Sequence, residues 1–265
     1  MGRSFKATGR CIWCGKSEPE VSFKNKPHIV PDSVGGSELG KDICDVCNAY
    51  FGASTHPNLP SPDLIFKEIF NLKRFFDGGK SITNGEKFRA SLFRVVDDKL
   101  YLKRSYLNST LIANQLKRAF YEIFLQKYHA FTGNGHDLAF SGVVAYARYN
   151  ENVSNLKVYY MHQEMWFRPT ILNKTFLLFS EHLVDELNMY GIFPFNFLGY
   201  NFYLEVFKDK ANENRDSFFE TILSKEGFLT TGVEGPAIEE FERIGQLHEI
   251  FNFLQIDGIE IDEKN

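Results

Sequence analysis

Long apolar runs are missing from this 265-residue sequence, and so are several familiar catalytic motifs. No uninterrupted apolar segment approaches the roughly 18 residues that a membrane-spanning helix needs, so we expect no integral membrane protein. The N-terminal segment lacks the apolar core of a secretory signal peptide, which predicts a cytoplasmic location. A glycine-rich phosphate loop and a serine nucleophile elbow are also missing, so the sequence gives no support to an ATPase or a serine hydrolase.

Cysteine is scarce, since the chain has four, and all of them lie within the first 47 residues. They form two C-x-x-C pairs, Cys11 with Cys14 and Cys44 with Cys47, which are separated by 29 residues. Two such pairs on tight turns complete a tetrahedral four-sulfur site that suits a structural zinc ion, and Gly15 supplies the positive φ that a zinc turn often requires. Two disulfides or a redox-active C-x-x-C are the alternatives, but they fit the spacing and the missing secretory signal less well.

A strong net charge is missing too, because 30 basic side chains face 34 acidic ones and the formal net charge is −4. This excludes a simple polycation that coats nucleic acid. The charge is nevertheless uneven: residues 61–130 carry 13 basic and 7 acidic side chains, whereas residues 208–265 carry 6 and 14. The basic residues of the middle segment form either solvated helix faces or a strip that tracks phosphates. The candidate strip consists of Lys73, Arg74, Lys80, Lys87, Arg89, Arg94, Lys103, Arg104, Lys117 and Arg118.

The segment between the cysteine pairs has the pattern of a small unit clamped by a metal. Residues 21–24 alternate between apolar and polar, which predicts a short strand, and residues 28–30 predict a second one. Residues 42–51 predict a helix, with Asp42 as its N-terminal cap and Gly52 as the glycine after its last turn. Two strands and a helix of this size lack a hydrophobic core, so we expect the metal to supply the stability of the unit.

These residues resemble the HNH endonuclease family in its four-cysteine, zinc-ribbon form. The pattern is C-x-x-C, then H-I-V-P-x-S-x-G-G, then C-x-x-C-N-x-x-x-G, and it covers residues 11–52. The resemblance implies a ββα-metal fold that hydrolyses phosphodiester bonds with the help of Mg²⁺, Mn²⁺ or another divalent cation. Beyond the cysteines, the matching residues are His28, Ile29, Pro31, Ser33, Gly35, Gly36, Asn48 and Gly52.

The resemblance also implies roles for three side chains. His28 would be the general base that takes a proton from the attacking water, and Asn48 would bind the catalytic metal. Asp42 stands where the family has the middle Asn, and it would orient the base. Plainer roles are a satisfied core histidine for His28, a hydrogen bond to a carbonyl of the zinc turn for Asn48, and helix capping for Asp42.

One position departs from the family pattern. The residue before the catalytic histidine is usually Asp, Glu or His and binds the catalytic metal, but here it is Pro27, which offers no ligand atom. Either another side chain takes this place, or the metal site is weakened or lost. By sequence, the candidates for the replacement are Asp32, Glu38, Asp45 and His56.

The rest of the chain is predicted to form a larger α+β domain. We place the nuclease domain at residues 1–56 and the larger domain at 57–265, with a linker rich in Pro and Ser over 56–63. We expect helices over 63–76, 108–131, 137–149 and 236–254, a hairpin over 87–103, and strand-like segments at 157–163, 174–181 and 191–207. The domain could read the target, mediate dimerisation or bind a partner, and the sequence does not choose among these.

Other candidate residues in the larger domain carry weaker signals. The spacing of His136, His162 and His182 specifies neither a metal site nor a catalytic triad, so packing or surface roles are favoured, and His129 is read as part of the core. Trp166 and Tyr200 have side chains that can stack on a base, but core or interface positions are more typical of them.

The sequence therefore predicts an α+β protein that begins with a zinc-stabilised HNH endonuclease module. We expect it to cut double-stranded DNA through backbone contacts, without a membrane and with a homodimer or a regulatory protein as possible partner. By resemblance, proteins of this build serve in restriction, in anti-phage defence or in mobile elements. The alternatives are a catalytically degenerate zinc-ribbon protein that only binds nucleic acid, and an effector nuclease controlled by a ligand or partner.

Overall fold

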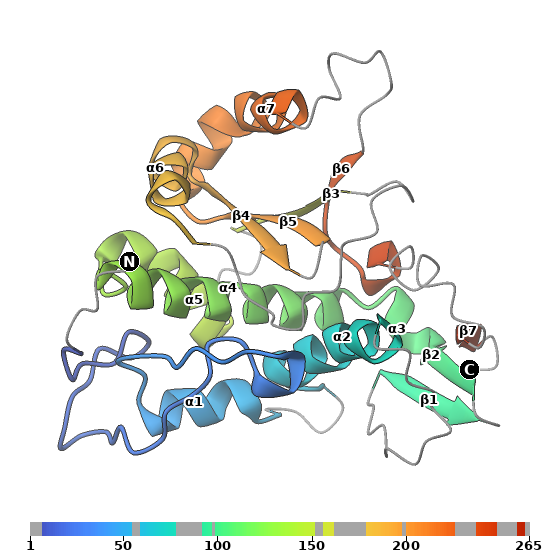
Figure 1. Cartoon of the computed structure of the whole chain (residues 1–265), viewed down its shortest axis with the longest axis horizontal. Helices are drawn as coiled ribbons and strands as arrows, with labels where there is room; N and C mark the ends of the chain where they lie inside the picture. Colours follow the sequence, from blue (N-terminus) through green and yellow to red (C-terminus); the bar gives the residue numbers. More distant parts are fainter. Residues whose placement is uncertain are drawn as a thin grey trace.

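A computed structural model describes residues 7–54, 59–77, 92–96, 99–151, 156–161, 179–197, 200–225, 237–247 and 259–262. In these ranges the chain forms helices and two small sheets, which confirms the predicted α+β class (Figure 1). None of the helices in these ranges combines the length and the apolar character that crossing a membrane requires.

The N-terminal module, residues 7–54, consists mostly of loops. Its regular elements are the 3-10 helix η1 (Asp32–Val34) and helix α1 (Asp45–Gly52). The predicted strands over 21–24 and 28–30 are wrong as regular strands, because the described part of the module has only two isolated β-bridges, Arg10 with Ser17 and His28 with Leu39. His28 therefore pairs with Leu39, which follows it in the sequence, and not with the predicted strand at 21–24, which precedes it.

Asp45, the first residue of α1, explains why residues 21–24 remain a loop. Its backbone N–H donates to the Ser22 carbonyl at 2.8 Å, and its carboxylate accepts from the N–H groups of Lys24 at 3.2 Å and Asn25 at 2.8 Å. The Ser22 hydroxyl also donates to this carboxylate and is the main reason why the pKa of Asp45 falls to about 2. These contacts use the backbone groups that a strand partner would need.

Helix α1 begins three residues later than predicted. Cys44 precedes it in an extended conformation, and Ala53 follows it. Asp42 is therefore not the helix cap, and Gly52 is the last helical residue instead of a glycine beyond the helix. Asp42 itself adopts φ 56°, in the left-handed region, and its side chain contacts other elements.

The larger domain is built around α4 (Thr110–Thr132), which lies between the N-terminal module and an antiparallel sheet (Figure 1). The sheet has the order β4-β5-β3-β6, and its strands are β4 (Ile192–Phe197), β5 (Tyr200–Glu205), β3 (Val158–Met161) and β6 (Ile238–Glu240). Helices α2 (Pro62–Asp77) and α5 (Ser141–Tyr149) pack along α4, and the short η2 (Leu138–Phe140) leads into α5. Helices α6 (Glu181–Tyr190) and α7 (Lys208–Lys225) pack against β4 on the other side of the sheet (Figure 1).

A second sheet is formed by three short strands. The hairpin β1 (Phe93–Val96) and β2 (Lys99–Lys103) is antiparallel, and β7 (Ile259–Asp262) pairs with β2 in parallel. The short helices α3 (Arg104–Leu107) and η3 (Ile244–Leu247) lie in contact with each other.

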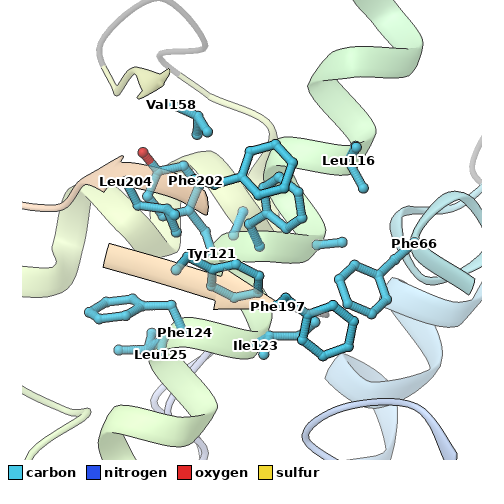
Figure 2. Close-up of a cluster of buried hydrophobic side chains, with 14 of the residues drawn as sticks. Phe66, Leu116, Tyr121, Ile123, Phe124, Leu125, Val158, Phe197, Phe202 and Leu204 are labelled. Carbon is cyan, nitrogen blue, oxygen red and sulfur yellow. The ribbon is translucent and has the colours of Figure 1, made fainter. Parts of the chain in front are cut away.

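Aromatic side chains fill the space between α4 and the antiparallel sheet (Figure 2). Phe120 is fully buried, and its ring centroid lies 4.5 Å from that of Phe202 and 4.9 Å from that of Phe195. Phe66 of α2 joins the same cluster through Phe197, at 5.1 Å. Such contacts bury a large apolar area per residue, so this cluster stabilises the larger domain.

Most of the long elements were predicted. The helices expected over 63–76, 108–131 and 137–149 correspond to α2, α4 and η2 with α5, and the described strands of the 87–103 hairpin are β1 and β2. Residues 157–163 contain β3, and residues 191–207 contain β4 and β5, which pair with each other as antiparallel strands.

One predicted helix is wrong in its described part, one predicted strand is tested only at its end, and two helices were not predicted. The helix expected over 236–254 is replaced by β6 and η3 in its described part, because residues 238–240 complete the sheet by pairing with β3. The strand expected over 174–181 does not form at 179–181, where Ser180 caps the start of α6, and residues 174–178 lie outside the described ranges. Helices α6 and α7 were missed, and α7 is rich in charged residues.

Candidate functional site

Two tight turns bring the four cysteines together. In the first, Gly15 adopts φ 71° as predicted, and its N–H donates to the Cys11 carbonyl at 2.9 Å. In the second, Cys44 precedes α1 and Cys47 lies in its first turn. The four sulfur atoms all lie within 4.8 Å of one another, and those of Cys14 and Cys44 are 3.8 Å apart. Sulfur atoms bound tetrahedrally at 2.3 Å from a zinc ion would be about 3.8 Å apart, so the cluster fits zinc.

The thiols are free, which contradicts the disulfide alternative, and the larger domain contacts one of them. Arg148 of α5 donates from Nε to the sulfur of Cys47 at 3.4 Å, and its guanidinium lies 3.7 Å from the centre of the Tyr50 ring. A hydrogen bond between the Cys11 and Cys47 thiols is the main reason why the pKa of Cys11 is lowered, and the same contact raises the pKa of Cys47, so Cys11 is the first of the two to become a thiolate. A positive charge at the cluster offsets the negative charge that four thiolates bring to a zinc ion.

His28 forms a β-bridge with Leu39, and the intervening loop begins directly after His28. The His28 side chain is exposed, which argues against a core role. Its Nδ1 is 3.2 Å from the carbonyl oxygen of Gly36. A backbone carbonyl can only accept, so Nδ1 carries the proton in the neutral ring and donates it to Gly36. Nε2 is then left with a lone pair, which is the state that a general base requires.

The two consecutive glycines of the motif hold this carbonyl in place. Gly35 adopts φ 92°, a conformation that side chains disfavour, and it ends η1. A Cβ atom on Gly36 would lie 1.8 Å from the carbonyl oxygen of Val30. Any side chain at position 36 would therefore displace the carbonyl group that orients His28.

Asn48 lies on α1 and is half-buried. In the described part of the chain its side-chain amide has no hydrogen-bond partner, so it is not used to cap a carbonyl of the zinc turn, and its oxygen remains available to a ligand. No hydrogen bond joins His28 to Asn48 in the same residues.

Asp42 contacts the beginning of the module and the larger domain instead of His28. Its carboxylate, which is buried, accepts from the N–H groups of Thr8 at 2.8 Å and Gly9 at 2.9 Å, and from the Thr8 hydroxyl at 2.9 Å. His129 Nε2 of α4 lies 3.0 Å from the same carboxylate. Burial opposes ionisation of Asp42, but the hydrogen bonds from Thr8, His129 and Gly9 outweigh it and lower its pKa.

The four residues that could supply the metal ligand missing at Pro27 have different surroundings. The carboxylate of Asp45 accepts hydrogen bonds from the N–H groups of Lys24 and Asn25. Glu38 forms an ion pair with Lys127 of α4. Asp32 is exposed and makes no side-chain hydrogen bond or ion pair within the described residues. His56 lies outside the described ranges.

The weaker candidates of the larger domain are mostly structural. His129 is fully buried, as predicted, and His136 lies near it, with ring centroids 5.0 Å apart. Tyr200 is buried near Phe70, which agrees with a core position. His182 is exposed and pairs with Glu186 at 3.2 Å, and the placements of His162 and Trp166 lie outside the described ranges.

One face of α4 carries a polar stripe that is buried against the N-terminal module and the residues that follow it. The stripe consists of Gln115, Arg118, Glu122, Gln126 and His129, all at least nine-tenths buried and spaced three or four residues apart. The assignment of Arg118 to a phosphate-binding strip is therefore wrong, because its guanidinium donates to the Tyr50 hydroxyl at 2.9 Å and to the Ala147 carbonyl at 3.0 Å. The spacing of these five polar residues was visible in the sequence, but a polar stripe on a helix normally indicates a solvent-exposed face.

The other residues of the predicted strip are either partly described or not described. Lys117 is half-buried, and burial lowers its pKa, while Lys103 packs beside the Tyr106 ring. The remaining side chains lie outside the described part, namely those of Lys73, Arg74, Lys80, Lys87, Arg89, Arg94 and Arg104.

Comparison with protein-family models matches residues 11–62 to a family described as HNH endonuclease. Neither the curated proteins nor the solved structures include a match to the chain. The matched segment contains both cysteine pairs, His28 and Asn48. Residues 11–62 therefore match the HNH endonuclease family, and a larger α+β domain follows them.

Proposed function

We propose that this protein is a metal-dependent endonuclease that hydrolyses phosphodiester bonds of double-stranded DNA in the cytoplasm. The observation that carries the proposal is the orientation of His28, whose Nδ1 faces the Gly36 carbonyl while the ring is exposed. This leaves Nε2 free to accept a proton from water as the water attacks the phosphorus. The match of the surrounding residues to the HNH endonuclease family supports the same reaction.

The catalytic cation in this proposal is Mg²⁺, Mn²⁺ or another divalent ion, which stabilises the charge that develops on the phosphate and on the leaving oxygen. Asn48 would bind it through its side-chain oxygen, which no described residue occupies. Asp42 is assigned an assisting role. Because its carboxylate bonds to Thr8, Gly9 and His129, it would act by holding the module in position and not by touching His28.

A zinc ion at Cys11, Cys14, Cys44 and Cys47 is proposed as the structural metal. The support is the close approach of the four sulfur atoms and the hydrogen bond from Arg148. The module has one helix of eight residues and no regular strand in its described part, so we expect it to depend on this ion for its fold.

The larger domain, proposed to comprise residues 57–265, would position DNA or control access to His28. A role in restriction or anti-phage defence, with a homodimer or a regulatory protein partner, is part of the proposal and rests on the resemblance alone. A second candidate function is a degenerate HNH protein that binds nucleic acid without cutting it, and Pro27 favours it because this position offers no ligand atom.

Plasmid nicking separates the two candidates. Zinc-loaded protein would be incubated with supercoiled plasmid and Mg²⁺, Mn²⁺ or Ni²⁺, in parallel with His28→Ala and with His182→Ala, an exposed histidine on α6, as the matched control. We expect nicking by the wild type and by His182→Ala, and a loss of at least about 100-fold in His28→Ala, which is the usual contribution of a general base. Equal nicking by His28→Ala, or none with any metal, would leave the binding-only function.

A further inference from the structure

The buried polar stripe of α4 contains a carboxyl group that no positive partner neutralises directly. Glu122 is 6% exposed, and Gln126 donates from Nε2 to its Oε1 at 2.9 Å. Within the described residues, Oε2 of Glu122 and Oε1 of Gln126 are buried and have no hydrogen-bond partner. Buried oxygen atoms of this kind are costly unless a proton donor or a cation satisfies them.

A second carboxyl group faces the first. Asp63, in the first turn of α2, is close enough for its negative charge to act on Glu122, and this charge adds to burial in raising the pKa of Glu122 well above its usual range. Lys67 reaches Asp63 at 3.5 Å, and the side chains of this ion pair are partly exposed. Two carboxylates this close cannot both be ionised without help, so the pair holds either a proton or a cation.

The pair lies next to the parts of the module that carry His28 and Asn48. On one side, a Cβ atom placed on Gly40 would be 3.3 Å from Oε1 of Gln126 and 3.6 Å from the ring of Pro27. The N–H of Gly40 also donates to the Pro27 carbonyl at 2.8 Å, at the base of the hairpin with His28.

On the other side, the pair contacts the end of α1. A Cβ atom placed on Gly52 would lie 3.7 Å from Oδ2 of Asp63, and Gly52 follows Asn48 by one helical turn. The carboxyl pair is thus located between the residue that lacks a metal ligand and the helix that carries Asn48. The possible ligand atoms of this site are carboxylate and amide oxygens, which are the ligands that Mg²⁺ and Mn²⁺ prefer.

A different cluster, Asp42 with His129 and His136, has its ligand atoms equally close but fits a metal less well. The N–H of Gly135 donates to Nδ1 of His129 at 3.0 Å, so Nε2 of that ring carries the proton and points at Asp42. A metal bound at Nε2 would require the proton on Nδ1, where it would meet the N–H of Gly135. This cluster is therefore a hydrogen-bonded contact between the module and α4.

We propose that Asp63, Glu122 and Gln126 form a divalent-cation site that supplies the acidic ligands missing at Pro27. The inference deepens the proposed function and rests on it in one respect, namely that the cation is the one used in phosphodiester hydrolysis. The larger domain would then contribute carboxylates to the metal centre of the nuclease module, in addition to Asn48.

Manganese binding to the intact, zinc-loaded protein tests the site directly. Mn²⁺ would be titrated into wild type, Glu122→Gln, Asp63→Asn and the control Glu213→Gln, an exposed residue on α7, while electron paramagnetic resonance measures the free ion. We expect wild type and Glu213→Gln to bind one Mn²⁺ per chain. Glu122→Gln and Asp63→Asn should weaken binding by at least about tenfold, the lower end of the effect seen when even outer partners of a metal site are removed. Glutamine has the shape of the protonated acid, so thermal unfolding without Mn²⁺ should be nearly unchanged in Glu122→Gln.

The outcomes distinguish this inference from the proposed function. If wild type binds no Mn²⁺, or if both substitutions bind it as tightly as wild type, the pair holds only a proton and the cation site is refuted. If Glu122→Gln loses Mn²⁺ binding but wild type nicks no plasmid, the cation site stands and the nuclease function fails. His28→Ala should bind Mn²⁺ like wild type, since His28 is assigned to the base and not to the cation.

Discussion

The N-terminal module and the larger domain are stabilised in different ways. In the module, one short helix and many loops surround four cysteines, and single side chains such as Asp45 organise whole segments. In the larger domain, aromatic rings of α2, α4 and the antiparallel sheet pack against one another. The difference follows from size, because about 50 residues with little regular structure bury too little apolar surface to fold without a metal or another staple.

The two regions nevertheless share one interior. Trp13 and Phe51 of the module belong to the same buried cluster as Phe66 and Phe120. Beside this apolar contact lies the polar stripe of α4, with Gln115 bonded to the Pro60 carbonyl and His129 to Asp42. The module is thus held by apolar packing and by buried hydrogen bonds at the same surface.

Removal of zinc should give the largest difference in stability between the module and the larger domain. Cys44→Ser, or strong chelation of the wild type, is expected to unfold the module, because a structural zinc ion contributes on the order of 10 kcal/mol to the folding of such units. Trp13 is 1% exposed and its ring lies 4.9 Å from that of Phe51, so its fluorescence should shift to the red when the module unfolds. A Trp166→Phe background leaves Trp13 as the single tryptophan.

The larger domain should retain most of its helical circular dichroism in the same experiment. Ser37→Ala, at an exposed position of the module, serves as the control and should leave the fluorescence unchanged. Cys44→Ser with the fluorescence of the wild type would show that the module does not need the metal.

Truncation of the aromatic core tests how the larger domain is stabilised. Phe120→Ala removes a fully buried ring from between α4 and the sheet, and it should lower the free energy of unfolding by about 3–5 kcal/mol. Leu111→Ala, on the same helix but 64% exposed, should change it by less than about 0.5 kcal/mol. Urea denaturation of zinc-loaded protein measures both, and a Phe120→Ala effect as small as that of Leu111→Ala would contradict the assignment of the core.

The contact between His129 and Asp42 should give the smallest effect, and one that depends on pH. Burial lowers the pKa of His129 in the folded protein below the value of about 6.5 that the unfolded chain has. As the pH falls through 6.5, the unfolded chain binds a proton that the folded chain does not, so the free energy of unfolding decreases. His129→Gln should remove this part of the pH dependence and cost about 1 kcal/mol at pH 7.5, the value of a typical hydrogen bond.

Denaturation curves between pH 5 and 8 check this expectation. His182→Gln, at an exposed ion pair on α6, should keep the pH dependence of the wild type. A His129→Gln variant with the same slope as the wild type would mean that His129 is not held neutral by its surroundings.

The sequence was most informative where chemistry depends on local spacing. The positive φ of Gly15 and the meeting of the four cysteines follow from the C-x-x-C turns, and helix α4 follows from its apolar periodicity. The helix predicted over 236–254 failed because its residues pair with β3, which is distant in the sequence. Local propensity carries no record of such a partner.

The candidate site divides in the same way. His28 and Asn48 were proposed from the motif, but the Gly36 carbonyl that accepts from His28 is a backbone group, and no pattern of side chains indicates it. Asp42 was assigned to helix capping or to the base, because its partner His129 comes 87 residues later. The polar residues of α4 were visible as a stripe, but only the docked module makes that stripe an interior surface.

The hydrogen bond from Arg148 to Cys47 has a consequence for how the N-terminal module can be inherited or engineered. A fragment that ends near residue 56 would lose this arginine, the partner of Asp42, and the apolar cover of Trp13 and Phe51. Grafted onto a foreign protein, it would expose that surface to solvent, and a zinc ion at its four cysteines would have less charge compensation. Recombination between related genes should therefore preserve α2, α4 and α5 together with the module, as one transferable block.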